Sequence, residues 1–329
     1  MKKILALLAL LLLTSCSSGG PSTPQEQETL TIGLTYIPDV QFAPVYVAEA
    51  NGYFADAGLD ITIRHHGAQE SLFGAIQAGE EDIVFAGGDE MMQARSTGVD
   101  IVNWATMYQT YPVALIVKAD SDINSAADLE GKSVGLPGPY GENYFALLAM
   151  IDEYGLEDVD INYIGYTQTT ALATDSVDAI IGFSNNDVVA MRHAGIDVVE
   201  LPLVEGRLPL IGVGLGSMAD HLDPETLAKV VEALEQGTRN ATADPEAALD
   251  ITRSYVPSLA DPEQRELAAQ VLDATLELYS GGQSFGHQDV QLWAQMSEFM
   301  EDAELLETPV AAEDAYTLAV LDYRTNNSL

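Results

Sequence analysis

Basic side chains are scarce in this sequence. Lysine and arginine together number 13, against 51 aspartates and glutamates, and the formal net charge is −38 at pH 7. Nucleic acids owe most of their affinity for proteins to cationic contacts with phosphate, so this balance excludes a nucleic-acid partner. The acidic excess is typical of the surface of a highly soluble protein, including one adapted to salt. It does not identify a ligand, because local groups set the potential of a pocket.

Cysteine occurs once, at Cys16, so no disulfide can form within the chain. Lys2 and Lys3 precede an apolar run, Ile4–Leu13, which is too short to span a bilayer and fits the core of a signal peptide. The motif Leu-Thr-Ser-Cys that ends at Cys16 matches a bacterial lipobox. A structural cysteine would instead be expected inside a folded core. We therefore expect residues 1–15 to be a lipoprotein signal peptide, and Cys16 to carry the lipid that anchors an extracytoplasmic protein to the cell membrane.

Long apolar runs are missing from the rest of the chain, where no segment approaches the ~20 residues that a membrane-spanning helix needs. Residues 17–29 also lack the apolar side chains that would form a core. We expect 16–29 to be a flexible tether. The roughly 300 residues that follow are enough for two lobes with separate cores.

Strand-like and helix-like segments alternate through most of this remainder. The apolar run 30–35 predicts a buried strand, and the apolar spacing within 41–51 predicts a helix after it. Such alternation indicates α/β architecture. Two further apolar segments, 113–118 and 209–216, are expected to cross between lobes.

These crossings divide the chain into lobe 1, residues 30–115 together with 217–329, and lobe 2, residues 116–216. Each lobe is expected to hold a sheet flanked by helices. After Asp223 the pattern becomes helical, beginning with an N-cap, a proline and a first-turn acid. We expect this helical C-terminal tail to pack on lobe 1 as a support.

Three segments resemble one protein family. They read TYIPDVQFAPVYVAEANGYFADAGLDI from Thr35, ALIVKADSDINSAADLEGKSVGLPGP from Ala114, and GFSNND from Gly182. They resemble the substrate-binding lipoproteins of bacterial ABC importers, in the branch that shares its fold with the fungal thiamine-pyrimidine synthase. The resemblance covers about residues 30–217. It implies a type II periplasmic-binding-protein fold that closes over a small molecule and delivers it to an ABC permease and its ATPase.

The same segments bear on the ligand. The first is similar to the Trp/Tyr-x-Pro-Asn/Asp pattern of thiamine-pyrimidine binders, whereas QFAP from Gln41 and the pair Asn185-Asn186 are more similar to riboflavin-binding members. The resemblance thus implies riboflavin first and a thiamine-type pyrimidine second. A binder of sulfonate- or nitrate-type solutes in the same superfamily and a synthase-like enzyme are the alternatives.

Ligands of open α/β sheets sit beside the loops at the carboxyl ends of strands. In this chain those loops carry aromatic and short polar side chains and no arginine. Rings would stack on a flat heterocycle, and amides and carboxylates would bind its polar edges. Glu70, Glu90, Gln109, Tyr111, Glu142 and Phe183 occupy these loops. The ligand contacts that we predict are Tyr36, Asp39, Gln41, Phe42, Gln69, Asp89, Tyr108, Tyr140, Tyr144, Tyr166, Asn185 and Asn186.

Several of these residues have a structural alternative. Tyr144 could belong to a core, Asp89 could serve only as a helix cap, and Asn185-Asn186 could form a turn. Tyr36 and Phe42 are the strongest candidates, because loop aromatics beside a proline have no obvious core to fill.

The candidate loops also contain four acids, Asp39, Glu70, Asp89 and Glu142. Binders of sulfonate or nitrate are expected to use arginine or helix N-termini, and acids at these positions would repel an anion. A neutral or weakly cationic heterocycle is therefore predicted.

Catalysis is not expected. A pyridoxal phosphate enzyme of the synthase type needs a lysine for its Schiff base, and Lys118, Lys132 and Lys229 lie outside the candidate loops. His65 and His66 are adjacent on a predicted strand, so they would point to opposite faces and could not chelate a metal together. The sequence therefore predicts neither an enzyme nor a cofactor nor a metal site.

Overall fold

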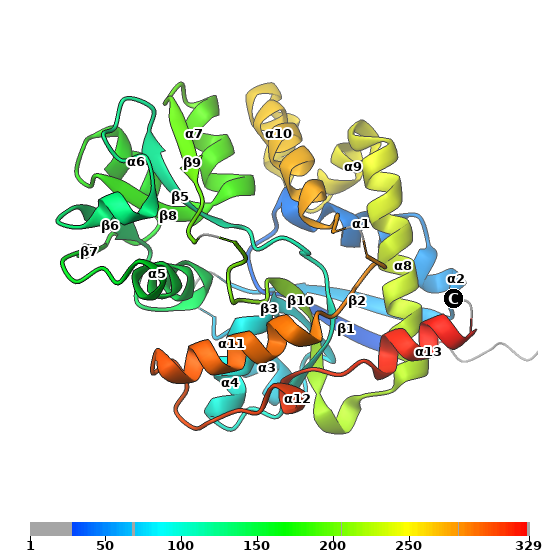
Figure 1. Cartoon of the computed structure of the whole chain (residues 1–329). Coiled ribbons are helices and arrows are strands. Elements are labelled where there is room, and N and C mark those ends of the chain that lie inside the picture. The colour runs from blue at the N-terminus through cyan, green and yellow to red at the C-terminus, as the bar shows by residue number, and fades with distance from the viewer. Residues whose placement is uncertain (1–27, 68–69, 205, 282, 328–329) are drawn as a thin grey trace, which may run out of the picture.

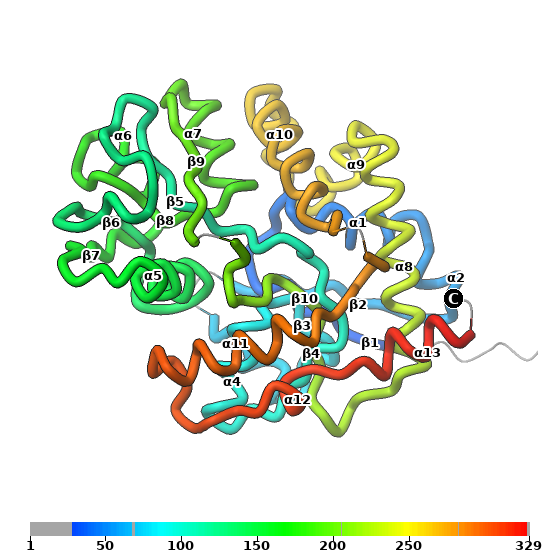
Figure 2. Tube along the Cα trace, in the orientation of Figure 1, coloured from blue at the N-terminus to red at the C-terminus, as the bar shows by residue number. Residues whose placement is uncertain are grey.

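Two five-stranded sheets form the framework of the protein. The computed structural model describes residues 28–67, 70–204, 206–281 and 283–327. The first sheet has the order β2-β1-β3-β10-β4 and the second β7-β6-β8-β5-β9. Helices flank both sheets (Figures 1 and 2), so the predicted two-lobed α/β architecture is confirmed. The predicted signal peptide, Cys16 and most of the tether lie outside the described residues.

Apolar, β-branched runs account for most of the strands. Lobe 1 contains β1 (Glu28–Leu34), β2 (Leu59–His65), β3 (Ile83–Gly87), β4 (Ile101–Thr106) and β10 (Val213–Met218). Lobe 2 contains β5 (Val113–Lys118), β6 (Ser133–Leu136), β7 (Asp160–Tyr163), β8 (Ala179–Phe183) and β9 (Val198–Leu201). β10 runs antiparallel between β3 and β4, whereas β1 pairs in parallel with β2 and β3.

The chain crosses between the sheets at residues 107–112 and 202–212. The lobe boundaries expected from the sequence, 115/116 and 216/217, fall inside β5 and β10. The segments expected to cross, 113–118 and 209–216, thus form β5 and the start of β10, and the chain changes lobe in the non-strand segments before these strands.

The first loop of lobe 1 is shaped by Asp39 and Pro44. The Gln41 N–H donates to Asp39 Oδ1 at 3.0 Å and so caps the short 3-10 turn η1 (Val40–Phe42). Pro44 then lies in the first turn of α1 (Ala43–Ala50), where its missing N–H costs nothing. After the short helix α2 (Tyr53–Asp56), the chain enters β2.

Short helices connect the later strands. Lobe 1 contains α3 (Gly74–Gln77) and α4 (Gly88–Ser96); lobe 2 contains η2 (Ala126–Leu129), α5 (Gly141–Tyr154), α6 (Gln168–Ala173), the π-helical turn η3 (Ser184–Val188) and α7 (Val189–His193). The tail contains η4 (Ala219–His221), α8 (Pro224–Ala243), α9 (Pro245–Thr252), η5 (Pro257–Ala260), α10 (Pro262–Leu278), α11 (Val290–Asp302), α12 (Ala312–Ala315) and α13 (Ala319–Asn327). None of the helices in the described ranges is long and apolar enough to cross a membrane.

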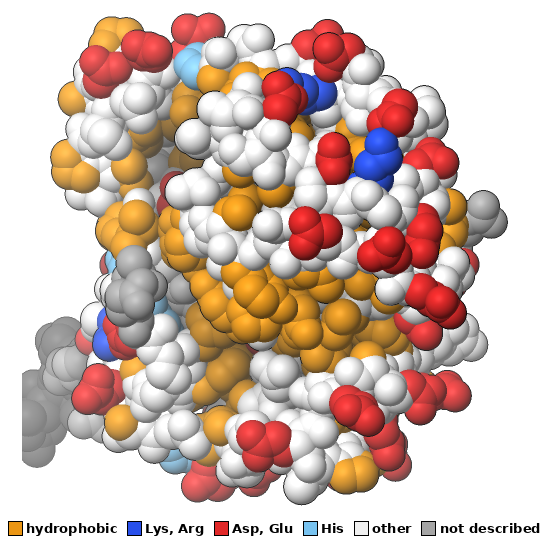
Figure 3. All heavy atoms as spheres, turned by 90° about the vertical axis from the view of Figure 1, so that its left-hand side faces the viewer, with side chains coloured by type: hydrophobic (Ala, Val, Ile, Leu, Met, Phe, Trp, Pro, Cys, Tyr) orange, Lys and Arg blue, Asp and Glu red, His pale blue; other side chains and the backbone are white. Residues whose placement is uncertain are grey.

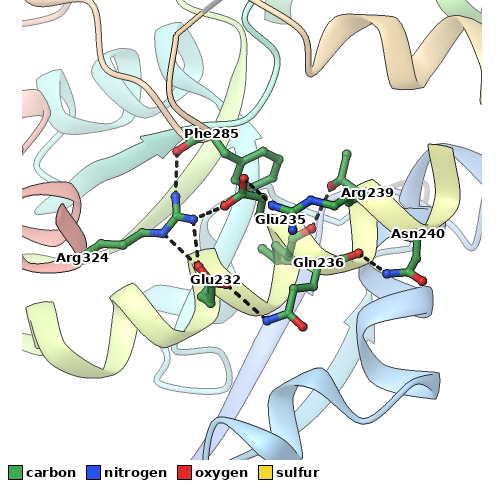
Figure 4. A network of polar contacts seen from close by, with 9 residues as sticks. Glu232, Glu235, Gln236, Arg239, Asn240, Phe285 and Arg324 are labelled. Carbon is green, nitrogen blue, oxygen red and sulfur yellow. Dashed lines mark hydrogen bonds and ion pairs between the residues drawn. The ribbon is translucent and has the colours of Figure 1, made fainter. Parts of the chain in front are cut away.

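The tail packs largely on lobe 1, and α8 lies against α1. At the helix contact a Cβ on Gly237 would lie 2.3 Å from the Pro44 carbonyl oxygen, so only glycine permits this approach. Helix α13 is held on α8 by Arg324, whose Nη2 donates to Glu232 Oε2 at 2.8 Å and which also pairs with Glu235 (Figure 4).

The tail also contacts lobe 2. Asn185 of η3 donates through Nδ2 to Thr275 Oγ1 of α10 at 2.9 Å, and Trp293 and Met296 of α11 belong to the same buried cluster as Phe145 of lobe 2. The C-terminal helices therefore join the two lobes, in addition to supporting lobe 1 as expected from the sequence.

Acidic side chains lie on the surface of the face that includes lobe 2. Figure 3 shows Asp and Glu side chains around the margins of this face, few Lys or Arg, and hydrophobic side chains gathered in the middle. Where basic residues occur, ion pairs with carboxylates are the rule, as at Lys118–Asp175 and Arg192–Glu200. Most of the negative charge is thus solvated.

Candidate interlobe site

Loops from the carboxyl ends of strands in both sheets meet between the lobes. Tyr36 follows β1, and Tyr166 follows β7 in the opposite lobe. Burial raises the pKa of Tyr166, and the nearby Tyr140 and Tyr36 hydroxyls and the Glu90 carboxyl raise it further. Burial likewise raises the pKa of Tyr36, with added contributions from Asp39 and Asp187. Each tyrosine therefore lies within electrostatic reach of groups from the other lobe.

Tyr36, Tyr140 and Tyr166 are all exposed to solvent. Tyr36 is 38% exposed, Tyr140 53% and Tyr166 66%. Large aromatic rings left accessible at the junction of two lobes are available for stacking against a planar molecule. We call these three residues the tyrosine rim; all three are among the ligand contacts expected from the sequence, and that role stays a prediction.

A group of buried carboxyls lies near the tyrosine rim, where Glu90 contributes to the raised pKa of Tyr166. Asp89 and Glu90 stand at the start of α4, and Glu142 stands at the start of α5 in the other lobe. A Cβ on Gly87 would lie 2.5 Å from Asp89 Oδ1, 3.1 Å from Glu90 Oε2 and 3.3 Å from Glu142 Oε1. Asp89, Glu90 and Glu142 are called the carboxyl cluster below.

Few hydrogen-bond donors face the carboxyl cluster. The Tyr111 hydroxyl donates to Asp89 Oδ2 at 2.6 Å, the Glu90 N–H donates to Asp89 Oδ1 at 2.7 Å, and the Gly87 N–H donates to Glu90 Oε2 at 3.1 Å. Glu142 Oε1 is buried without a hydrogen-bond partner in the described chain. Burial raises the pKa of all three carboxyls, and mutual repulsion adds to this for Asp89 and Glu142.

Two predicted contacts are buried in the core of lobe 1. Phe42 is 3% exposed and packs edge-on against Phe85, with ring centroids 5.9 Å apart. The turn η1 directs its ring into the sheet, so the expectation that this aromatic has no core to fill is corrected. Tyr108 is also buried, but its hydroxyl has no hydrogen-bond partner in the described chain and lies within electrostatic reach of Glu142 and Asp39.

The remaining predicted contacts are more dispersed. Asp39 caps η1 and has its pKa raised by burial. Tyr144 packs partly buried against the core that includes α5, and Asn185 is turned toward α10. Gln41 and Asn186 are half-buried, and Gln69 lies outside the described residues.

Sequence reasoning missed Asp187, which joins the site from η3. Burial raises its pKa to about 6, although its carboxylate accepts a hydrogen bond from the Phe183 N–H at 2.7 Å. Asp187 directly follows the Asn185-Asn186 pair that drew attention to this loop, so its position in sequence was the available signal.

A cavity of about 400 Å³ adjoins the site. Both crossing segments and the start of α11 line it, and its polar side chains include Gln109, Arg207 and Asp289. Of the predicted contacts it includes only Tyr108. The cavity thus lies beside the crossing segments and shares Tyr108 and Tyr111 with the surroundings of Asp89 and Glu142.

His65 and His66 have different hydrogen-bond partners. His65 Nε2 lies 2.7 Å from the Tyr46 hydroxyl, whereas His66 Nε2 lies 2.8 Å from Glu81 Oε1, so the two rings diverge as expected. No group of three or more histidine, cysteine or acidic residues in the described part of the chain is arranged to hold a metal.

Comparison with known proteins assigns this architecture to a family. A profile described as NMT1/THI5 like matches residues 39–248. The riboflavin-binding protein RibY of Chloroflexus aurantiacus is 32% identical, over 95% of this chain and 95% of that protein. The formylaminopyrimidine-binding protein of Halalkalibacterium halodurans is 27% identical, over 96% of this chain and 98% of its own length.

Solved structures show the same fold at lower identity. The periplasmic aliphatic sulphonate binding protein SsuA of Escherichia coli gives a TM-score of 0.70 at 15% identity, with 87% of this chain and 91% of that chain covered. SsuA of Xanthomonas axonopodis pv. citri, bound to MOPS, gives 0.67 at 20% identity, with 89% and 99% covered. The two lobes described above therefore have the periplasmic-binding-protein fold, as the sequence resemblance implied. On the family profile and the relation to RibY, the chain belongs to the NMT1/THI5-like family.

Proposed function

We propose that this protein is the extracytoplasmic solute-binding component of an ABC importer. Its ligand would be an uncharged, flat heterocycle, with riboflavin favoured and a thiamine-type pyrimidine next. The observation that carries the proposal is the convergence of exposed tyrosines from both lobes over buried carboxyls. Two relatives whose names specify riboflavin and formylaminopyrimidine, each aligned over nearly the whole chain, support the same ligand class.

The two layers of the site would have different roles. The rings of the tyrosine rim would stack on the ligand, at about 0.5–1.5 kcal/mol per ring pair beyond area burial. The carboxyl cluster and Tyr108 would bind N–H and hydroxyl groups at the ligand's polar edge. Because the groups come from both lobes, closure of the lobes would assemble the site.

Delivery requires a membrane location and partners. Lipidation of Cys16 would hold the protein at the outer side of the membrane, and the tether would let the lobes reach a permease and its ATPase subunits. This part of the proposal rests on the sequence motif and the family.

Sulfonate binding is the main alternative within the fold. It is less compatible with the site, because none of the groups that shift the pKa values of the carboxyl cluster is a lysine, arginine or histidine. An anion placed there would meet acids and no described cation.

A synthase-like enzyme is the second alternative, since 4-amino-5-hydroxymethyl-2-methylpyrimidine phosphate synthase of Legionella pneumophila is 24% identical over 74% of the chain. The lysines that a Schiff base would need are paired with acids elsewhere: Lys118 with Asp175, Lys132 with Asp122, and Lys229 with Glu225.

Protein purified from its own cells tests the proposal directly. Native mass spectrometry and absorbance should detect a bound flavin or pyrimidine, released unchanged on denaturation. A bound sulfonate would contradict the ligand class. A pyridoxal absorbance band, or conversion of the ligand on incubation, would contradict the binding role.

A further inference from the structure

The carboxyl cluster is shared between the lobes. Asp89 and Glu90 belong to α4 of lobe 1, whereas Glu142 belongs to α5 of lobe 2. Glu90 Oε1 reaches toward lobe 2, where a Cβ on Gly141 would lie 3.2 Å from it, and Glu142 Oε1 approaches Gly87 of lobe 1. Opening the lobes would therefore separate Glu142 from the other two acids.

The surroundings of the carboxyl cluster offer no compensating positive charge in the described chain. The side chains that face it are the Tyr111 hydroxyl from the crossing segment, Tyr108 after β4, and Tyr166 after β7. All three are phenols. Like carboxylates this close in a dry site cannot all remain ionised.

In the open, ligand-free form, water would reach the three carboxyls and relieve the repulsion between them. With the lobes apart, each carboxyl would be solvated and would titrate near its ordinary value, whereas burial in the closed form raises all three pKa values. The closed form consequently binds more protons than the open form. Closure is favoured at low pH and is lost as the pH rises through the closed-state values.

We propose that closure of the two lobes is coupled to proton uptake by Asp89, Glu90 and Glu142. Glu142 Oε1 is buried without a hydrogen-bond partner in the described chain, and an N–H or O–H group of a ligand could donate to it. The inference deepens the proposed function, because it gives the pH dependence expected for ligand capture at that same site.

Isothermal titration with riboflavin in two buffers of different ionisation enthalpy measures the coupling. We expect roughly 0.5–1 proton to be taken up per riboflavin bound near neutral pH, and the association constant to fall by up to about tenfold per pH unit at alkaline pH. Glu142→Gln should at least halve the uptake and flatten the pH dependence. Glu153→Gln, an exposed acid on the same helix, should behave as the wild type. Proton release, or equal uptake in Glu142→Gln and the wild type, would overturn the proposal.

Small-angle X-ray scattering of the ligand-free protein separates this inference from the choice of ligand. The radius of gyration of the wild type should increase from about pH 5 to pH 9, and that of Glu142→Gln should change less. If riboflavin does not bind but the radius responds in this way, the favoured ligand is wrong and the proton coupling stands. If riboflavin does not bind and the radius is constant, the coupling is wrong as well.

Discussion

Tyr36 and Tyr166 are exposed residues of opposite lobes, and Tyr166 lies within electrostatic reach of both Tyr36 and the buried Glu90. This arrangement suggests two separate binding roles, one for the exposed rings and one for the buried carboxyl oxygens. Exposed rings can bind any planar group, whereas buried oxygens without enough donors select for N–H and O–H groups. In the proposed site, affinity and selectivity would therefore depend on different side chains and can be tested separately.

Replacing Tyr166 tests the stacking role. Tyr166→Ala should weaken riboflavin binding by roughly 2- to 10-fold, which corresponds to the loss of about 0.5–1.5 kcal/mol from one ring pair. Tyr166→Phe keeps the ring and should bind nearly as the wild type. Tyr163→Ala removes a tyrosine that is 53% exposed in the same lobe and should have no effect. Quenching of riboflavin fluorescence measures all three, and equal losses in Tyr166→Phe and Tyr166→Ala would argue against stacking.

Asp187 makes a pH-dependent contribution to stability. Its pKa is raised to about 6 from an ordinary 3.8, so the folded chain holds this proton more tightly than the unfolded chain. The associated stability is fully present below about pH 4 and is lost as the pH rises through 6. Asp187→Asn keeps an oxygen for the Phe183 N–H.

The expected result is a crossover with pH in urea unfolding. Asp187→Asn should match the wild type near pH 4 and exceed it above pH 6, by up to about 3 kcal/mol in the free energy of unfolding. A variant that is less stable at pH 8 than the wild type would show that the carboxylate has a partner outside the described contacts.

The sequence predicted the positions of some candidate site residues well and of others badly. The strand-end rule placed Tyr36, Tyr140 and Tyr166 where the lobes meet, because it depends only on topology. It misjudged Phe42, since the cap at Asp39 starts a turn that directs the following ring into the core. Such local geometry is not contained in the apolar pattern.

At the level of elements, Arg324 links α13 to α8. Arg324 is 13% exposed in its side chain and bonds to Glu232 and Glu235 of α8 (Figure 4). Arg324→Ala would leave two half-buried acids without this partner and should lower the free energy of unfolding by about 1–3 kcal/mol. Arg239→Ala removes a 67% exposed partner of Glu235 and should cost at most about 0.5 kcal/mol. Equal effects of the two substitutions in urea unfolding would contradict this account.

The α1–α8 contact gives a second test at this scale. Alanine is the better helix former by about 1 kcal/mol, but a Cβ at position 237 would strike the Pro44 carbonyl and the Ala48 side chain. Gly237→Ala should therefore destabilise the protein by about 1–3 kcal/mol. A variant more stable than the wild type in thermal unfolding would show that the helices move apart freely.

Element types followed from the sequence more readily than element connections. The apolar run 30–35 predicted β1, because burial and strand propensity agree there, whereas the segments 113–118 and 209–216 were expected as crossings and instead form β5 and the start of β10. The place of β10 between β3 and β4, and the contact of α10 with lobe 2, arise from tertiary packing. Neither leaves a periodic signal in the chain.

At the scale of the whole molecule, fold and ligand are independent pieces of information. The solved neighbours with TM-scores of 0.70 and 0.67 include sulfonate binders, and the same two lobes here enclose acids. Function therefore has to be argued from the site. A ligand that binds the closed form should stabilise the protein by mass action, by about 2.7 kcal/mol at a concentration 100 times Kd.

Equilibrium titration of the purified protein with riboflavin and, separately, with an alkanesulfonate tests the central claim most directly. If the lobes close on a planar, uncharged ring between tyrosines and carboxyls, riboflavin should bind at one site per chain and the sulfonate should not bind. Binding of the sulfonate without binding of riboflavin, or riboflavin binding that is unchanged when Tyr36 and Tyr166 are both replaced by alanine, would contradict it.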